Sequence, residues 1–160
     1  MKKLFVILIL CLSTMASRAQ SISMSDLTNL ATINMTDANY FLTSGKPFKQ
    51  DYSEVVNGLT LRHYVGTTAA SKCESVITGD GIKTSTPLVL HIVTYTTTNT
   101  KYILELIGQA KSAELKKNFQ GLDQFNNIYI FDNFLYTVHV YIKTDNSEGT
   151  IKVEQKYYVE

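Results

Sequence analysis

The chain of 160 residues contains no tryptophan, only two prolines and only two cysteines. Cys11 lies inside the apolar run near the amino terminus, so removal of that run would leave Cys73 as a single thiol. A single thiol cannot form an intrachain disulfide, and stability must therefore come from the burial of apolar side chains. Because Cys73 lies shortly before the apolar pair Val76-Ile77, we expect its side chain to be buried and inert.

The chain also lacks a concentration of positive charge. It has 15 basic residues against 14 acidic residues. The one basic group, formed by Lys111, Lys116 and Lys117, is interrupted by Glu114. A nucleic-acid-binding surface requires lysine and arginine side chains clustered on one face. We therefore expect no nucleic acid among the partners of this protein.

No sequence signature of a catalytic or cofactor-binding site is present. There is no GxSxG segment, no phosphate-binding GxxxxGK[ST] loop, and neither an HxH nor an HExxH pair. The segment Gly79-Asp80-Gly81 resembles part of an oxygen-ligand loop, but its neighbours do not offer the six or more oxygens that Ca²⁺ requires. It predicts a tight turn instead. We therefore expect no enzyme activity, no cofactor and no metal site.

The amino terminus has the three parts of a secretory signal peptide. Lys2 and Lys3 are followed by the apolar run 4–12 and then by small and polar residues. The apolar run is too short to cross a bilayer as a permanent anchor, and the small side chains of Ser17 and Ala19 place the expected cleavage after Ala19. We expect residues 1–19 to be a signal peptide and the product to be exported, periplasmic or extracellular, without a transmembrane span.

The remaining 141 of the 160 residues are expected to form a single α+β domain over residues 20–160. Three basic residues and no acidic ones are lost with the signal, so the net charge of this domain is −2. Ser25 is expected to cap a first helix, and Thr36 a second helix that stops at Gly45. A further helical stretch is expected from Ile103, continuing after Ser112 to Gly121.

The strand signals are strongest in the carboxy-terminal quarter. Strands at 126–131, 134–144 and 150–159, with a turn at Asp132-Asn133, are expected to form a three-stranded antiparallel meander. Earlier in the chain, Asn57-Gly58 predicts a tight hairpin between 51–56 and 59–66. Residues 88–96 are predicted to form one more strand, with Leu90 and Ile92 on its aliphatic face. Residues 67–86 show no regular pattern.

The same order of elements occurs twice. A shift of about 76 positions brings Leu27 onto Ile103 and Gly45 onto Gly121, and a shift one residue shorter brings Asn57-Gly58 onto Asp132-Asn133. This predicts pseudo-repeats at about 24–96 and about 100–159, each an ααβββ unit; chance agreement is the alternative. Two such units joined edge to edge would give a two-layer sandwich, an antiparallel sheet of about six strands with helices on one face.

This layout resembles small exported proteins of Gram-negative bacteria that are built from tandem helix-plus-meander repeats, and it is similar to the β-lactamase-inhibitor-protein-like architecture. The resemblance covers almost the whole of residues 20–160 and rests on the order of elements. The chain departs from that inhibitor in lacking its disulfides and its tryptophan-rich binding face. The resemblance implies a protein-binding or envelope-associated role and does not imply a particular target.

Candidate site residues come from histidines and tyrosines in the predicted strands. His91 and His139 lie out of phase with the aliphatic positions of their strands, so we expect both on the other face of the sheet. Such a pair could bind a metal or transfer protons, but no third ligand has suitable spacing, and two partly exposed strand histidines are the other interpretation. We take the candidate interaction face to be His91, Tyr95, Tyr129, His139 and Tyr141.

Tyrosine suits an interaction face because it offers a large area, few rotamers and a polar tip, although it also simply suits strands. The sequence thus favours an exported, non-catalytic module that binds another protein or a cell-envelope component. A small secreted hydrolase that uses a strand histidine is the alternative, and a structural envelope protein without a discrete site is a third hypothesis.

Overall fold

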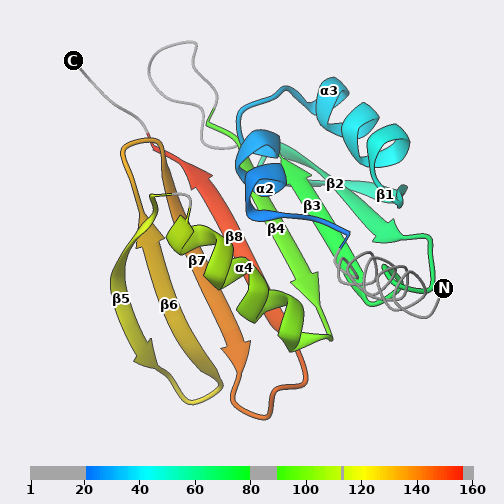
Figure 1. Cartoon of the computed structure of the whole chain (residues 1–160). Helices are drawn as coiled ribbons and strands as arrows, with labels where there is room; N and C mark the ends of the chain where they lie inside the picture. Colours follow the sequence, from blue (N-terminus) through cyan, green and yellow to red (C-terminus); the bar gives the residue numbers. More distant parts are fainter. Residues whose placement is uncertain (1–20, 80–89, 113, 157–160) are drawn as a thin grey trace, which may run out of the picture.

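The computed structural model describes residues 21–79, 90–112 and 114–156, and it shows an α+β fold of two layers (Figure 1). One antiparallel sheet contains eight strands in the order β1-β2-β3-β4-β8-β7-β6-β5. The described helices lie on one face of this sheet (Figure 1). The predicted fold class and the placement of the helices are therefore confirmed, but the sheet has eight strands and not about six.

Two short helices precede the first strand, and the cap of each lies two residues before the predicted one. Ser23 caps α2 (Met24–Leu30) in a capping box with Asp26. The side chain of Asn34 caps α3 (Met35–Tyr40) by accepting hydrogen bonds from the amides of Thr36 and Asp37. The side chain of a cap binds a backbone amide two or three residues after it. The prediction that Ser25 and Thr36 cap these helices was therefore wrong. A π-helical turn, η1 (Phe41–Gly45), ends at the predicted residue.

Helix α4 (Thr100–Ser112) crosses the second half of the sheet and ends earlier than the sequence predicts. Glu114 adopts the left-handed conformation with φ of 59°, and the amide of Leu115 donates to the carbonyl of Ala110 at 3.2 Å. These are the features of a helix carboxy terminus. The predicted helical continuation to Gly121 is therefore wrong, because that stretch forms strand β5 (Lys116–Leu122).

The first four strands form a meander. They are β1 (Phe48–Val56), β2 (Leu59–Gly66), β3 (Glu74–Gly79) and β4 (Ile92–Thr97). The predicted hairpin is confirmed, since Asn57 and Gly58 both have positive φ, 53° and 79°, as a two-residue hairpin turn of this kind requires. Strand β3 lies in the stretch that showed no regular pattern. The predicted turn at Asp80-Gly81 and the first two residues of the strand predicted over 88–96 lie outside the described residues.

The last four strands form a second meander from β5 through β6 (Asn126–Asp132), β7 (Tyr136–Lys143) and β8 (Gly149–Gln155). The three strands predicted here are confirmed, and their ends differ from the prediction by at most two residues, except that the predicted end of the last strand, at 159, lies outside the described residues. Asn133 makes the turn between β6 and β7 by accepting hydrogen bonds from the amides of Leu135 and Tyr136. Paired in register, β4 and β8 join the two meanders at the centre of the sheet.

The predicted register between the two halves does not match this topology. The turn at Asn57-Gly58 joins the first and second strands of its meander, whereas Asp132-Asn133 lies at the turn between the second and third strands. The second predicted helix pair also fails, because its second member is β5. An alignment by about 76 positions therefore does not superpose equivalent elements.

The hydrophobic core lies between the helices and one face of the sheet, here called the inner face. Leu27, Leu30, Ile103 and Leu106 from the helices are at most 1% exposed. The sheet contributes fully or almost fully buried side chains from both meanders: Tyr64, Val76, Val93, Tyr95, Phe131, Val138, Val140, Ile151 and Val153. Both halves of the chain thus share one core. No helix in the described ranges has the length and apolar composition needed to cross a membrane.

Candidate functional site

The other side of the sheet, here called the open face, has no described helix packed against it (Figure 1). Residues directly opposite each other on neighbouring strands share a face, so the register defines rows across this surface. One row crosses all eight strands: Tyr52, His63, Ile77, Thr94, Lys152, His139, Ile130 and Phe119. The open face therefore combines aliphatic, aromatic and charged side chains in one continuous layer.

In the second half of this row, His139 on β7 contacts both an aromatic and a charged neighbour. Its ring lies parallel to that of Tyr141, with 6.4 Å between centroids and an interplanar angle of 5°. Its Nε2 atom lies 3.5 Å from Oε2 of Glu154 on β8, and the other carboxylate oxygen of Glu154 pairs with the Nζ atom of Lys152 at 2.5 Å. These side chains form an ordered, partly exposed cluster.

A second cluster, also built from a histidine, a tyrosine and a glutamate, lies at the β1 end of the row, on β1 and β2. The ring of His63 stacks on Tyr52 with 4.0 Å between centroids and an interplanar angle of 12°. Its Nε2 atom lies 2.8 Å from Oε1 of Glu54. Sequence reasoning did not select this cluster, although counting back from the Asn57-Gly58 turn pairs Tyr52 with His63.

The structure does not bring the five predicted interaction residues together. His139 and Tyr141 lie on the open face, but Tyr95 is completely buried on the inner face and Tyr129 packs against the core. His91 precedes β4, and its carbonyl accepts a hydrogen bond from the amide of Gln155. The prediction was wrong for Tyr95. This residue is two positions after Val93 on β4, so both side chains point to the same face of the sheet, and that face is the one that packs against the core.

Tyr95 is instead part of a buried polar pair on the inner face. Its hydroxyl donates to Oε2 of Glu74 at 3.0 Å. Burial, followed by the Glu74 carboxylate, raises the pKa of Tyr95. Glu74 is only 2% exposed, and burial raises the pKa of its carboxyl group as well. The neighbouring Cys73 is half-buried rather than fully buried, and its sulfur accepts a hydrogen bond from the hydroxyl of Thr97.

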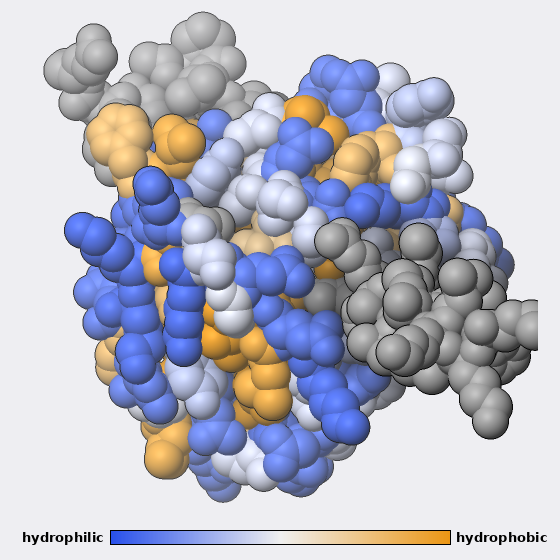
Figure 2. Space-filling model, viewed as in Figure 1, coloured by the Kyte–Doolittle hydropathy of each residue, from blue (hydrophilic) through white to orange (hydrophobic). Residues whose placement is uncertain are grey.

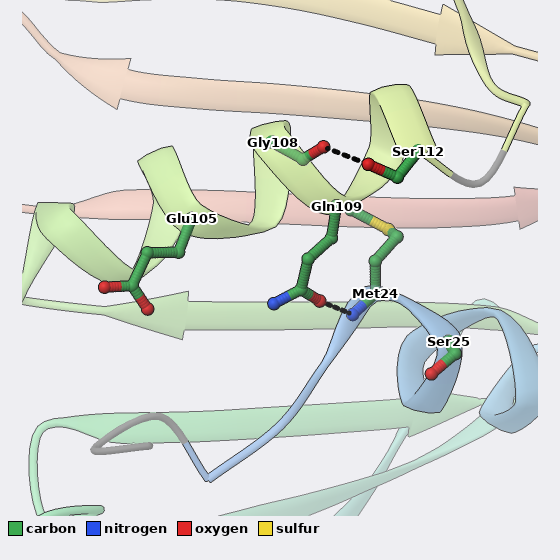
Figure 3. Close-up of a pocket in the computed structure, with 6 residues that line it drawn as sticks. All are labelled: Met24, Ser25, Glu105, Gly108, Gln109 and Ser112. Carbon is green, nitrogen blue, oxygen red and sulfur yellow. Dashed lines mark hydrogen bonds between the residues drawn. The ribbon is translucent and has the colours of Figure 1, made fainter. Parts of the chain in front are cut away.

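The helix side of the molecule carries a shallow cleft of about 530 Å³ between α2 and α4 (Figure 3). It is lined by Met24, Ser25, Glu105, Gly108, Gln109 and Ser112. The side-chain carbonyl of Gln109 accepts a hydrogen bond from the amide of Met24 at 2.8 Å. This contact satisfies one of the free amides at the start of α2. The surface on this side is mainly hydrophilic (Figure 2). We interpret the cleft as the surface groove between two packed helices.

The described side chains offer little chemistry beyond binding. His63 and His139 each pair with a glutamate, and neither makes a hydrogen bond to a serine or threonine hydroxyl or to a thiol. Nucleophilic catalysis would require such a contact between nucleophile and base. In the described ranges, no three histidine, cysteine or acidic side chains gather as a metal site would require.

Comparison with known proteins finds no matching family model, no similar curated protein and no similar solved structure.

Proposed function

We propose that this chain is an exported, non-catalytic module that binds another protein of the cell envelope through its open face. The observation that supports this proposal is the asymmetry of the sheet, because one face carries all the described helices and the other carries none. Aliphatic side chains such as Ile77 on β3 and Ile130 on β6 belong to the row that crosses that uncovered face. Exported location rests on the signal-peptide features of residues 1–19.

The shape of the open face favours a protein over a small molecule as the partner. Eight strands spaced by about 4.8 Å make a surface roughly 30 Å wide, the scale of a protein–protein interface. Small-molecule sites are concave and largely enclosed, and the described cleft lies on the helix side instead.

The chemistry of the open face also suits a protein partner. In both histidine–tyrosine stacks, the histidine also pairs with a glutamate on the neighbouring strand, and we expect these contacts to restrict the rotamers of the ring. Aromatic side chains that are already ordered lose little entropy on binding and often contribute most of the affinity. Because Lys152 and Glu154 both lie on this face, the partner is expected to present apolar surface with charges of both signs.

Removal of the cluster around His139 should therefore abolish binding without unfolding the protein. With His139→Ala and Tyr141→Ala combined, we expect at least a tenfold lower yield of the partner that cross-links to the unaltered protein in the producing cell. The matched control combines Tyr40→Ala and Leu104→Ala on the helix side, where these side chains are 72% and 57% exposed. Equal recovery with the unaltered protein and with the His139–Tyr141 variant would disprove the proposal.

We also propose that the two meanders descend from one ancestral unit, in the manner of the β-lactamase-inhibitor-protein-like architecture. Each consists of helical structure followed by four antiparallel strands. The last strand of each unit, β4 and β8, pairs with the other at the centre of the sheet. In this arrangement the equivalent turns are those at Asn57-Gly58 and at 123–125, and the repeat is one strand longer than the sequence predicts.

A further inference from the structure

The two edge strands of the sheet are exposed along almost their whole length. Strands β1 and β5 lie at opposite ends of the sheet (Figure 1). Every residue of β1 after Phe48 is exposed, and so is every residue of β5 except Gly121. An exposed edge strand presents unpaired backbone N–H and C=O groups to which a further strand can pair. Five of the ten large hydrophobic side chains exposed in the described ranges lie on these two strands: Tyr52, Val55, Val56, Phe119 and Leu122.

The directions of the strands allow a second copy of the chain to continue the sheet. Each strand is antiparallel to its neighbour throughout the sheet. In a sheet of eight strands, the two edge strands therefore run in opposite directions. If a second copy is placed beside the first without being turned over, its β1 lies antiparallel to β5 of the first copy. The helices of both copies then remain on the same side of the extended sheet.

The rows that cross the open face end in complementary side chains at the two edges. The row described above begins with Tyr52 on β1 and ends with Phe119 on β5, and the next row on this face begins with Glu54 and ends with Lys116. Extension of the sheet along these rows places the two aromatic rings opposite each other, and the carboxylate opposite the ammonium group. Cross-strand pairs of both kinds stabilise neighbouring strands, whereas like charges directly opposite each other destabilise them.

Both charged groups are accessible to a second copy. The side chain of Glu54 is 44% exposed, and only its Oε1 atom is used in the pair with His63. Lys116 is exposed, and its ammonium group forms no ion pair with any residue in the described ranges. A contact between Glu54 of one copy and Lys116 of the next therefore requires no described ion pair to break.

The net charge of each edge favours unlike edges over like edges. Strand β1 contains Lys49, Asp51 and Glu54, whereas β5 contains Lys116 and Lys117 and no acidic residue. Pairing of two β5 strands would bring four lysines together, and lysines on an edge strand oppose such pairing. Pairing of β1 with β5 brings acidic and basic strands together instead. The occupant that best fits each edge is thus the opposite edge of another copy.

We propose that copies of this chain assemble through their sheet edges, with β1 of one copy paired to β5 of the next. The contact uses a different surface on each copy and leaves one edge free at each end, so that further copies can add. Because β-sheets twist, successive copies are rotated relative to each other and the product is an open filament. The open face of each copy stays uncovered, and the inference is independent of the proposed function.

Sedimentation of the protein purified from the producing cell, over a range of concentrations at low ionic strength, tests this assembly in the absence of any partner. The weight-average mass is expected to rise with concentration and to pass about twice the monomer mass, because an open contact does not saturate at a pair. A mass that stays at the monomer value would overturn the proposal. A mass that levels off at twice that value would also overturn it, because it indicates a closed dimer.

Reversal of the two charges tests the register of the contact. Glu54→Lys places two ammonium groups opposite each other, and Lys116→Glu places two carboxylates opposite each other. Each single variant is expected to associate about fivefold more weakly than the unaltered protein. The double variant, and an equimolar mixture of the two single variants, should recover the association, because every contact then joins opposite charges again. A loss that neither of them recovers would contradict the proposed pairing.

The matched controls make the same changes of charge on the helix side. Lys101 and Glu105 are exposed residues of α4, and Lys101→Glu and Glu105→Lys are each expected to leave the association unchanged. Circular dichroism checks that all variants are folded. Equal weakening by the control variants would overturn the proposal, since net charge rather than position on the edge would then determine the association. Added salt should weaken the association of the unaltered protein, because the pair is exposed to screening.

Discussion

Replacing Gly66 with alanine is expected to lower the free energy of unfolding by about 3 kcal/mol or more, the upper end of the range for overpacking. Gly66 ends β2, and a Cβ atom there would overlap the backbone carbonyl of Ser71. Ser71 is fully buried, and its hydroxyl donates to the carbonyl of Pro47 at 3.3 Å. Because the obstacle is backbone rather than a flexible side chain, relief requires the whole connection between β2 and β3 to move. Urea denaturation followed by circular dichroism measures the effect.

Gly108 provides the matched control. It lies in the middle of α4, and an added Cβ atom would meet no heavy atom within 4 Å. Gly108→Ala is therefore expected to raise the free energy of unfolding by about 1 kcal/mol, the difference in helix propensity. An equal decrease in the free energy of unfolding in both variants, or no decrease in Gly66→Ala, would show that β2 and the connection after it do not pack as described.

Truncation of Ile151 to alanine is expected to cost about 3 kcal/mol, within the range for buried isoleucine. Ile151 on β8 is fully buried, and it lies directly between Tyr95 on β4 and Val140 on β7. Its side chain therefore fills the core at the line where the two meanders meet. The cavity left by the shorter side chain would remove contacts with both halves of the chain, and the same denaturation experiment measures the loss.

Thr150 offers a control on the same strand. It faces the open side, where its hydroxyl lies 3.2 Å from that of Thr96. Thr150→Ala is expected to cost about 1 kcal/mol or less, the usual value for a partly exposed hydrogen bond. If Ile151→Ala were no more destabilising than Thr150→Ala, the two meanders would not share a continuous core.

The elements predicted correctly from the sequence are those with strong local signals. The turn at Asn57-Gly58 needs two residues that tolerate positive φ, and the last three strands alternate over long stretches. Strand β5 lies at the edge of the sheet, begins with the polar residues Lys116, Lys117 and Asn118, and is mostly exposed. It forms through hydrogen bonds to the following strand β6, and such backbone pairing leaves no periodic pattern in the sequence of β5.

The candidate site was predicted only in part for a similar reason. Strand β4 has apolar residues in both phases, Ile92 in one and Val93 with Tyr95 in the other. Only the packing of α2 and α4 determines which phase faces the core, so the sequence could not decide where Tyr95 lies. His63 and Tyr52 could have been paired from the hairpin register, whereas the hydrogen bond between Tyr95 and Glu74 joins residues 21 positions apart and has no local signal.

Hydroxyl-radical footprinting of tyrosines, in the purified protein and in the cell that produces it, tests most directly whether the open face is the binding surface. Tyr52 and Tyr141 report on the open face, and Tyr40, which is 72% exposed on α3, reports on the helix side. If the open face is the binding surface, Tyr52 and Tyr141 are oxidised in the purified protein and protected in the cell, while Tyr40 is oxidised equally in both. Equal oxidation of all three tyrosines in both settings, or protection of Tyr40 alone, would contradict it.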